Sequence, residues 1–378
     1  MKLIYIANVR IPTEKAHGIQ IMKMCQAFAV AGYDLTLVVP RRKNEIKKSI
    51  WEYYDQEKNF RIEYLKITDF MKIVIPRISF YLQSRSFLKS VLFYLKNKNL
   101  DIVYSRDLAF AKRLSFFNKN VFCEMHSLPR SFDKNDLEKI KGVITITKGL
   151  KDALIKKGIP EDRILIAPDG VNIENFDIDI SKEEVRKKLD LPLNKKIVLY
   201  TGHLYKWKGA TVLLKAAQNF QFPISNFQNI LFVFVGGTEK DISNFKHQVL
   251  ILKLNNVLVI GHRPHQEIPA WLRAADVLVL PNSGKAEISK SWTSPMKMFE
   301  YMASQRPIVA SDLPSIREIL NENNAILVKS DNPQNLAEGI NQALENPDFS
   351  VKISSQAYQD VQKYTWQKRV DNILKFIK

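Results

Sequence analysis

The chain has 378 residues, of which 46% are hydrophobic and 25% charged, so it is long enough for two domains and is not a largely disordered protein. The formal net charge of +18 points to an anionic partner, such as nucleotide phosphates, lipid headgroups or nucleic acid. Cys25 and Cys123 each lie in an apolar pattern, which disfavours a disulfide framework and fits a reducing, cytoplasmic setting.

A first buried strand, rather than a signal peptide, is predicted by the N-terminal residues MKLIYIANVR, because the apolar run is short and a polar loop follows it. No apolar run in the sequence is long enough to span a bilayer. Any contact with a membrane is therefore expected to be peripheral, on the inner face of the cell membrane.

Short apolar runs alternate with amphipathic helical stretches along the whole chain, which is the pattern of an α/β protein with parallel sheets covered by helices. In the first half, strands are predicted at residues 2–7, 34–40, 101–105, 120–125, 142–146 and 163–168. In the second half, they are predicted at residues 196–202, 230–237, 256–261, 276–281, 307–312 and 324–328.

These two series predict two Rossmann-like domains, 1–183 and 184–362, joined through the polar segment 176–196. Ligands of such domains bind outside the carboxyl ends of the strands, so a ligand is expected in a cleft between the two. A final helix is predicted at 363–378.

Gly18 stands at the start of a helix, after the first strand and a long basic loop. The loop has no GxGxxG pattern, which disfavours a redox dinucleotide.

The segment 71–100 is basic and carries interleaved aromatic residues, with no acidic residue among them. Such a helix can lie on an anionic bilayer, and this is one interpretation of the segment. The other is a surface helix whose aromatic residues face the core. The residues concerned are Lys72, Arg77, Phe80, Tyr81, Arg85, Phe87, Lys89, Phe93, Tyr94, Lys96 and Lys98.

His126 lies at the carboxyl end of the predicted strand in FCEMHSLPR, where a histidine is often no more than a loop residue. Further along, the turn at Asp169 and Gly170 is expected to be structural. After the first strand of the second half, YTGHLYKWKGA offers Gly202 for a tight turn and His203, Lys206 and Lys208 as groups that can neutralise a diphosphate.

A helix is predicted from about Pro295 in SWTSPMKMFEYMA, with Ser294 as its N-cap and apolar residues at helical spacing. Its N-terminus follows a strand through a loop, so free N–H groups there favour a phosphate. Glu300, more than one turn along, can accept both hydroxyls of a ribose. Taken alone, however, such a glutamate is more often a solvated helix residue.

This segment resembles the donor-binding signature of the retaining glycosyltransferases of family 4, also called group 1, in which a glutamate on this helix holds the ribose. A second glutamate usually stands eight positions earlier and faces the transferred sugar, and here Trp292 takes its place. Pro295 stands where a glycine is common. A subset of the family carries a TSP-K-FEYMA version of the signature, and this chain resembles that subset.

The resemblance covers nearly the whole chain and implies a GT-B fold, with the final helix crossing back to the first domain. Lys208 matches a lysine that grips the diphosphate, and His203 replaces the family's arginine. His126 matches a histidine that faces the reacting sugar, although its neighbour is Ser127 rather than aspartate. In the family the loop after the glycine that matches Gly261 holds the base, so the resemblance makes His262, Arg263 and Pro264 candidate base contacts. The resemblance also implies that the loop before Gly18 closes over the donor phosphates or the acceptor. The implied donor-binding residues are Gly18, Gly202, Arg263, Ser294, Pro295, Met296, Lys297 and Glu300, and the implied catalytic residues are His126, Lys208 and His203.

The expected activity is transfer of a sugar, with retention, from a UDP- or GDP-sugar to a glycan or lipid-linked acceptor in cell-surface polysaccharide or glycolipid synthesis. No cofactor or metal is expected: the one D-x-D, Asp177 to Asp179, lies in the predicted linker, and cationic side chains would neutralise the diphosphate. A non-catalytic subunit of a glycan-assembly complex is the alternative. An epimerase or hydrolase is disfavoured by the loss of acid at Trp292. No nucleic-acid-binding module is recognised.

Overall fold

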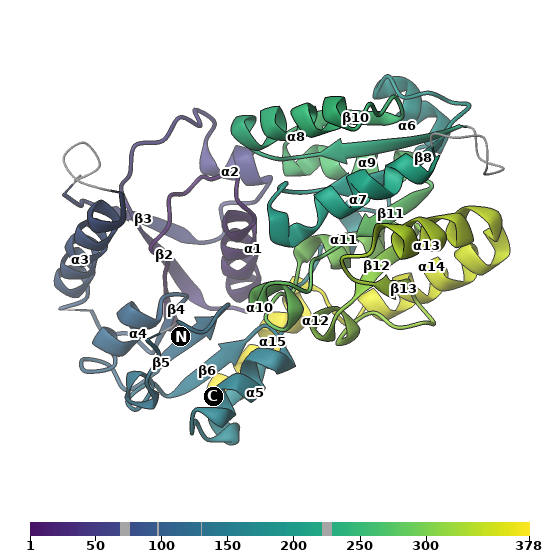
Figure 1. Cartoon of the computed structure of the whole chain (residues 1–378). Coiled ribbons are helices and arrows are strands. Elements are labelled where there is room, and N and C mark those ends of the chain that lie inside the picture. The colour runs from purple at the N-terminus through teal and green to yellow at the C-terminus, as the bar shows by residue number, and fades with distance from the viewer. Residues whose placement is uncertain (69–75, 97, 130, 221–228) are drawn as a thin grey trace. The chain divides into compact units, whose positions relative to one another are not determined.

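The computed structural model describes residues 1–68, 76–96, 98–129, 131–220 and 229–378 (Figure 1). The chain forms two compact units, one of Met1–Pro168 with Trp366–Lys378 and one of Asp169–Thr365, and each is described here by itself. The segment 176–196, predicted as the linker, lies inside the second unit, where it contains helix α6 (Lys182–Lys188). The boundary comes earlier than predicted because Val171, Ile173 and Phe176 are buried in the core of the second unit.

The first unit is built on a parallel sheet with strand order β3-β2-β1-β4-β5-β6-β7. All six strands predicted for this half are present. The additional strand, β3, lies at the edge of the sheet, where its half-exposed sequence RIEYL lacks the apolar run that marks a buried strand. The strands are β1 (Lys2–Ile6), β2 (Asp34–Pro40), β3 (Arg61–Leu65), β4 (Ile102–Ser105), β5 (Val121–Met125), β6 (Gly142–Thr145) and β7 (Ile164–Ile166).

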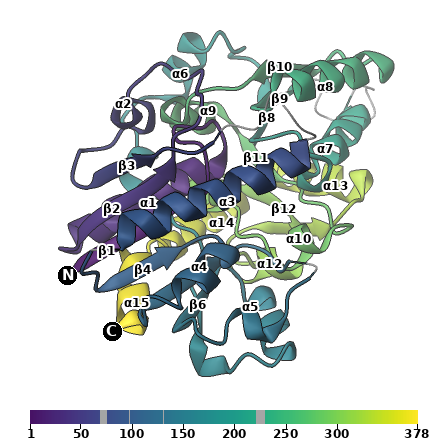
Figure 2. The same cartoon turned by 90° about the vertical axis from the view of Figure 1, so that its left-hand side faces the viewer.

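Helices cover this sheet, and the last helix of the chain is one of them. Helix α15 packs against α1, so the prediction that the C-terminal helix crosses back to the first domain is confirmed, with the helix beginning at Trp366. Helix α3 lies in the foreground of Figure 2. The α-helices described in this unit are α1 (Ala16–Val30), α2 (Ile50–Tyr54), α3 (Pro76–Leu95), α4 (Leu108–Leu114), α5 (Lys148–Lys156) and α15 (Trp366–Ile377). Within the described residues, no helix is both long and apolar enough to cross a bilayer.

The second unit holds a parallel sheet with strand order β10-β9-β8-β11-β12-β13, and every strand predicted for this half is present. The strands are β8 (Lys196–Thr201), β9 (Ile230–Val235), β10 (Val257–Gly261), β11 (Val277–Leu280), β12 (Ile308–Asp312) and β13 (Ile326–Lys329). Besides α6, the α-helices described in this unit are α7 (Ala210–Ala216), α8 (Glu239–Ile251), α9 (Ile268–Ala274), α10 (Glu287–Lys290), α11 (Met296–Ala303), α12 (Pro314–Arg317), α13 (Pro333–Glu345) and α14 (Pro347–Val361). The parallel sheets and covering helices confirm the predicted α/β fold class.

Glycines at the carboxyl ends of these strands fix the loops that follow. Gly202 has a φ of +116° and its N–H donates to the carbonyl of Val235, which holds the ends of β8 and β9 together. A Cβ on Gly236 would lie 2.4 Å from the carbonyl oxygen of Gly202, and one on Gly209 would lie 1.6 Å from that of Pro281. Only glycine permits backbones to approach this closely, so the backbones of the loops after β8, β9 and β11 are in direct contact.

We predict that Gly236→Ala destabilises the protein by roughly 2 kcal/mol or more, because the added methyl group meets backbone and the φ of +124° is strained for alanine. Gly261→Ala is the matched control in the same sheet: its φ is +86°, but the added Cβ meets only the end of the Ile242 side chain. We expect this control to cost about 1 kcal/mol. Urea unfolding monitored by circular dichroism measures both, and equal losses would contradict the prediction.

Candidate functional site

Glu300 is a buried residue of helix α11, not a solvated one. Its Oε1 lies 2.7 Å from Nε2 of His265, which comes from the short helical turn after β10. The family resemblance pointed to His262, Arg263 and Pro264 in this loop but not to His265. The side chains of His262, Arg263 and Pro264 are exposed, and Arg263 lies 3.9 Å from Glu267, so contact of these three residues with a base stays a prediction.

The start of α11 differs from the prediction in one respect. Pro295 takes the N-cap position with no side-chain cap, and the helix begins at Met296. Ser294 therefore does not cap the helix: its Oγ accepts a hydrogen bond of 3.1 Å from the backbone N–H of Asp169. This contact ties the Asp169 turn to the loop before α11, which supports the structural role predicted for that turn.

Two lysines share the surroundings of Glu300. Nζ of Lys297, in the first turn of α11, donates to the carbonyl of Thr201 at 3.1 Å and lies 3.7 Å from the ring centroid of Tyr200. Nζ of Lys208 lies 5.2 Å from the ring centroid of Trp207. Each ammonium group is close enough to Glu300 for the carboxylate to act on its titration.

Burial controls the charge of both lysines. Burial lowers the pKa of Lys208 to about 8, against the opposing effect of Glu300. Burial also holds the pKa of Lys297 well below its usual range, with the charge of Lys208 adding to the effect and that of Glu300 opposing it. An anion placed beside the two ammonium groups would stabilise their charged forms, so this group of residues is suited to a phosphate.

The remaining predicted residues of this loop are ordered by aromatic stacking. The imidazole of His203 stacks on Tyr205, with centroids 4.9 Å apart and an interplanar angle of 7°. The Tyr200 hydroxyl donates to the His203 carbonyl at 2.6 Å. Gly202 faces the Lys297 side chain, because a Cβ at that position would be 4.0 Å from the lysine Nζ.

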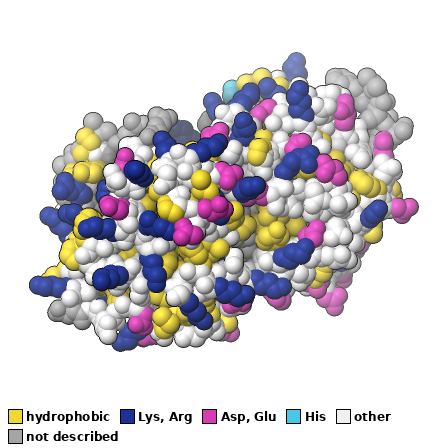
Figure 3. All heavy atoms as spheres, turned by 90° about the horizontal axis from the view of Figure 1, so that it is seen from below, with side chains coloured by type: hydrophobic (Ala, Val, Ile, Leu, Met, Phe, Trp, Pro, Cys, Tyr) yellow, Lys and Arg dark blue, Asp and Glu magenta, His cyan; other side chains and the backbone are white. Residues whose placement is uncertain are grey.

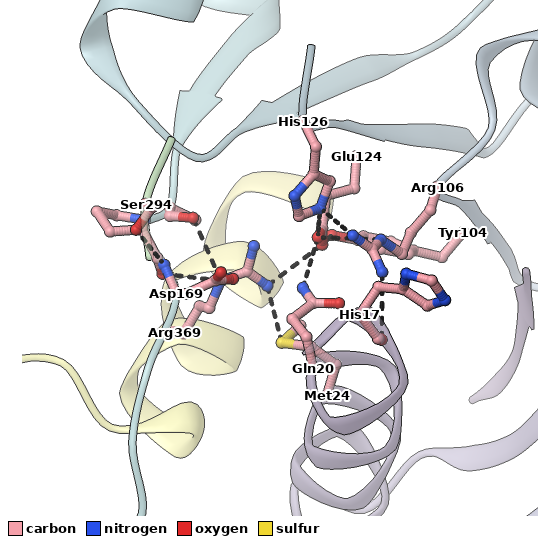
Figure 4. A network of polar contacts seen from close by, with 12 residues as sticks. His17, Gln20, Met24, Tyr104, Arg106, Glu124, His126, Asp169, Ser294 and Arg369 are labelled. Carbon is pink, nitrogen blue, oxygen red and sulfur yellow. Dashed lines mark hydrogen bonds and ion pairs between the residues drawn. The ribbon is translucent and has the colours of Figure 1, made fainter. Parts of the chain in front are cut away.

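In the first unit, His126 belongs to a buried polar network (Figure 4). Its Nε2 lies 2.6 Å from Oε1 of Glu124 and 2.9 Å from Nη2 of Arg106. The Glu124 carboxylate has no exposed surface and also accepts hydrogen bonds from Gln20, Tyr104 and Arg369. Of the residues in this network, only His126 was predicted. Glu124 could have been noticed, because it is a charged residue inside the apolar run VFCEM.

Gly18 lies in the first turn of α1, and its role in the structure is one of close packing. A Cβ there would lie 2.2 Å from the Tyr54 hydroxyl oxygen and 2.6 Å from Cγ2 of Thr13. The Tyr54 hydroxyl both accepts from the Thr13 N–H and donates to the Thr13 carbonyl. The predicted contact of this loop with donor or acceptor stays a prediction.

The aromatic residues of the basic segment 71–100 divide between the core and the surface, as helix α3 shows. Phe87 is buried and packs on Phe110 of α4, with ring centroids 5.2 Å apart. Tyr81 and Phe93, by contrast, are 57% and 83% exposed. They share the outer face of the helix with Ile78, Arg85 and Lys89, and the exposed Lys96 follows directly after the last helical residue. Residues 71–75, with Lys72, lie outside the described residues, as does the side chain of Arg77.

Charged side chains of both signs are dispersed over one face of the molecule. Lys and Arg side chains are scattered over the face shown in Figure 3, with acidic side chains among them. Asp177 and Asp179 are exposed. Among the described residues, no three His, Cys, Asp or Glu side chains converge as a metal site requires.

The chain is similar to known proteins along almost its full length. TuaC of Bacillus subtilis, named as a glycosyltransferase of teichuronic acid biosynthesis, is 22% identical, with 96% of this chain and 94% of that protein covered. Sucrose-phosphate synthase from Thermosynechococcus elongatus has a TM-score of 0.80 at 18% identity, with 99% and 98% covered. Anabaena HepE, solved in complex with UDP, has a TM-score of 0.74 at 18% identity, with 99% of both chains covered.

Two family models account for most of the sequence. Residues 18–175 match the model described as glycosyltransferase family 4, and residues 181–360 match the model described as glycosyl transferases group 1. The fold of the solved structures agrees with both units, which identifies the architecture as GT-B. The chain therefore belongs to the group 1 glycosyltransferases of the family 4 type.

Proposed function

We propose that this protein transfers a sugar from a UDP-sugar to a glycan or lipid-linked acceptor, with retention at the anomeric carbon, in the synthesis of a cell-surface polysaccharide or glycolipid. The observation that carries the proposal is the group formed by Lys208, Lys297 and Glu300, at the end of a parallel sheet in the second unit. The choice of UDP is supported by HepE, which binds UDP and UDP-glucose, and the choice of process by TuaC.

In this proposal the donor nucleotide lies on the second unit. The ribose hydroxyls donate to the Glu300 carboxylate, which His265 holds in place. The diphosphate lies against the start of α11, where free backbone N–H groups and the helix dipole favour negative charge. Lys208 and Lys297 neutralise it. Lys297 supplies the second positive charge, because His203 stands at the position of the family's arginine.

Charge on the leaving group drives the reaction. The bond between the anomeric carbon and the diphosphate oxygen breaks, and the acceptor hydroxyl oxygen bonds to the same face of that carbon. The hydroxyl proton goes to the departing diphosphate. Because negative charge accumulates on the diphosphate as its bond breaks, the two desolvated ammonium groups bind the transition state more tightly than the ground state.

Recognition of the sugar departs from the usual family pattern. Trp292 replaces the glutamate that would face the transferred sugar. We assign the chain to the subset with the TSP-K-FEYMA signature because residues 293–303 read TSPMKMFEYMA. His126 in the first unit is the residue that we propose contacts this sugar. If UDP binds and no UDP-sugar is turned over, the chain is instead the non-catalytic, nucleotide-sugar-binding subunit that the loss of the glutamate allows.

We predict that Glu300→Gln weakens UDP binding by roughly 10- to 150-fold, or about 1.5–3 kcal/mol, because a charged acceptor for the ribose hydroxyls is lost. The amide oxygen can still accept from His265, so the fold should survive. Isothermal titration calorimetry measures the affinity, with the exposed Glu267→Gln as control. Unchanged affinity together with an unchanged melting temperature would refute the assignment of Glu300.

We predict that UDP affinity falls as the pH rises above about 8, because binding requires the charged form of Lys208, whose pKa is lowered to about 8 by burial. Below that pH the lysine is already protonated; near it, UDP binding must take up a proton. The proton uptake is measured at pH 8 by calorimetry in buffers of different ionisation enthalpy. Lys208→Arg keeps its positive charge at high pH, so it should reduce both the loss of UDP affinity and the proton uptake. Lys206→Arg should leave the loss of affinity and the proton uptake unchanged. Equal pH slopes for both variants would exclude Lys208.

We also propose that the outer face of α3 holds the protein reversibly at an anionic membrane, where a lipid-linked acceptor would lie. Tyr81 and Phe93 project from this face beside Arg85, Lys89 and Lys96. Phe116 and Phe117, which follow α4 in the same unit, are exposed as well. Aromatic rings in the headgroup region and basic groups near anionic lipids both favour binding.

Replacing Arg85, Lys89 and Lys96 together by glutamate should abolish binding to anionic vesicles, since each basic group near such a surface contributes about 1 kcal/mol. Cosedimentation across a salt series measures it, and salt should release the unmodified protein. The same charge change at Lys240, Lys246 and Lys352, exposed residues of the second unit, is the control. Negligible binding of the unmodified protein to anionic and neutral vesicles alike at low salt would end the membrane proposal and leave the transferase proposal standing.

A further inference from the structure

We infer that Glu124 is a positioning residue that fixes His126 in its neutral Nε2–H tautomer, so that Nδ1 is presented as a hydrogen-bond acceptor for a hydroxyl group of the bound sugar. The inference rests on the proposed function, which places the sugar beside His126. It adds a residue, a tautomer and the chemistry of the ligand atom: a donor hydroxyl, rather than an anion.

The carboxylate of Glu124 is ionised although it is fully buried. Burial by itself would raise its pKa, but the guanidinium of Arg369, the bond to His126 and the charge of Arg106 hold the pKa well below its usual range. Oε1 accepts from Nε2 of Gln20 at 2.6 Å, and Oε2 accepts from the Tyr104 hydroxyl. These donors leave the carboxylate one orientation, with Oε1 directed at His126.

The tautomer follows from the contact between Oε1 and the imidazole. At 2.6 Å from an ionised carboxylate oxygen, Nε2 of His126 must carry a proton, because two lone pairs at that distance repel each other. In the alternative Nδ1–H tautomer, an unprotonated Nε2 would accept a hydrogen bond from Arg106 at 2.9 Å. The Glu124 carboxylate would then face the lone pair of Nε2. Arg106 instead interacts with the carboxylate through its charge, with Nε at 3.8 Å from Oε1.

The ring carries a single proton. Burial and the charge of Arg106 lower the pKa of His126 to about 4, although its bond to Glu124 acts in the opposite direction. The other groups that face it are His17, whose pKa burial also lowers to about 4, and Arg369. His126 is therefore neutral near pH 7, and its proton is on Nε2.

Nδ1 is left as the acceptor. No hydrogen bond among the described residues engages Nδ1, which lies on the side of the ring away from Arg106 (Figure 4). The side chain is 26% exposed, so a ligand can reach it. An unprotonated ring nitrogen accepts from a hydroxyl and offers nothing to a phosphate oxygen, which matches a sugar and excludes the diphosphate as its partner.

The arrangement depends on the last helix of the chain. Nη1 of Arg369, on α15, donates to Oε2 of Glu124 at 3.2 Å, while its Nε donates to the carbonyl of Pro168 at 2.9 Å. The guanidinium therefore links α15 to the end of the segment after β7 and to the carboxylate that holds His126.

The first test is NMR of the unmodified protein with ¹⁵N-labelled histidine, which needs neither activity nor a substitution. The resonances of His126, assigned by their loss in His126→Ala, should show a protonated Nε2 and an unprotonated Nδ1 from pH 6 to 8. A protonated Nδ1 would overturn the inference. Because no donor is present, this result is independent of whether the protein proves to be a transferase.

The second test is a double-mutant cycle on turnover of a UDP-sugar. Glu124→Gln should lower kcat about 10- to 100-fold, as loss of a residue that orients a site residue commonly does, with UDP affinity unchanged. His126→Ala should lower it at least as much, and the double variant should lose no more than His126→Ala alone. Glu138→Gln, at an exposed carboxylate of the same unit, is the control.

Multiplied losses in the double variant would show that Glu124 acts on the fold and not through His126, and would overturn the positioning role. If Glu124→Gln does not fold, the NMR measurement still decides the tautomer. Absence of turnover by the unmodified protein with every UDP-sugar would instead count against the proposed function.

Discussion

An ionised carboxylate with no exposed surface, that of Glu124, must be surrounded by donors, because burying an unpaired charge costs several kcal/mol. The donors come from α1, β4 and α15, so neutralising one charge fixes how these elements pack around β5. Apolar side chains of similar volume in place of Glu124 and its donors would pack, and stabilise the fold, equally well. We infer that the charge is retained because it orients the histidine at the end of the strand.

The candidate site of the second unit is the opposite case, because two buried lysines there share one buried carboxylate. Lys208 and Lys297 lie near one carboxylate, that of Glu300, and their depressed pKa values show that this compensation is incomplete. Burial destabilises the charged forms of these lysines, and a bound anion would stabilise them again. The protein thus surrounds a buried carboxylate with donors where it must hold a side chain in place, and leaves buried ammonium groups incompletely compensated where it must attract an anion.

Much of the fold could be predicted because strands buried on both faces of a parallel sheet produce continuous apolar runs. The edge strand β3 was not predicted, because an edge strand is half exposed and lacks a continuous apolar run. The boundary at Pro168 was not predicted either, because the sequence does not show which core the apolar residues after Pro168 join. Glu300 and Lys208 were found through motif resemblance. The Glu124–Arg369 pair was not, because 245 positions separate its members and no local pattern connects them.

The place of α15 in the first unit also affects how the protein is made. The ribosome completes Met1–Pro168 early, but Arg369 emerges only after the whole second unit. At about 5–20 residues per second, that takes roughly ten to forty seconds. During this interval Glu124 lacks its arginine partner and the face of α1 that contacts α15 is uncovered. The part of the chain that is synthesised first is therefore the last to finish folding, and in the meantime its open apolar face is a natural target for chaperones.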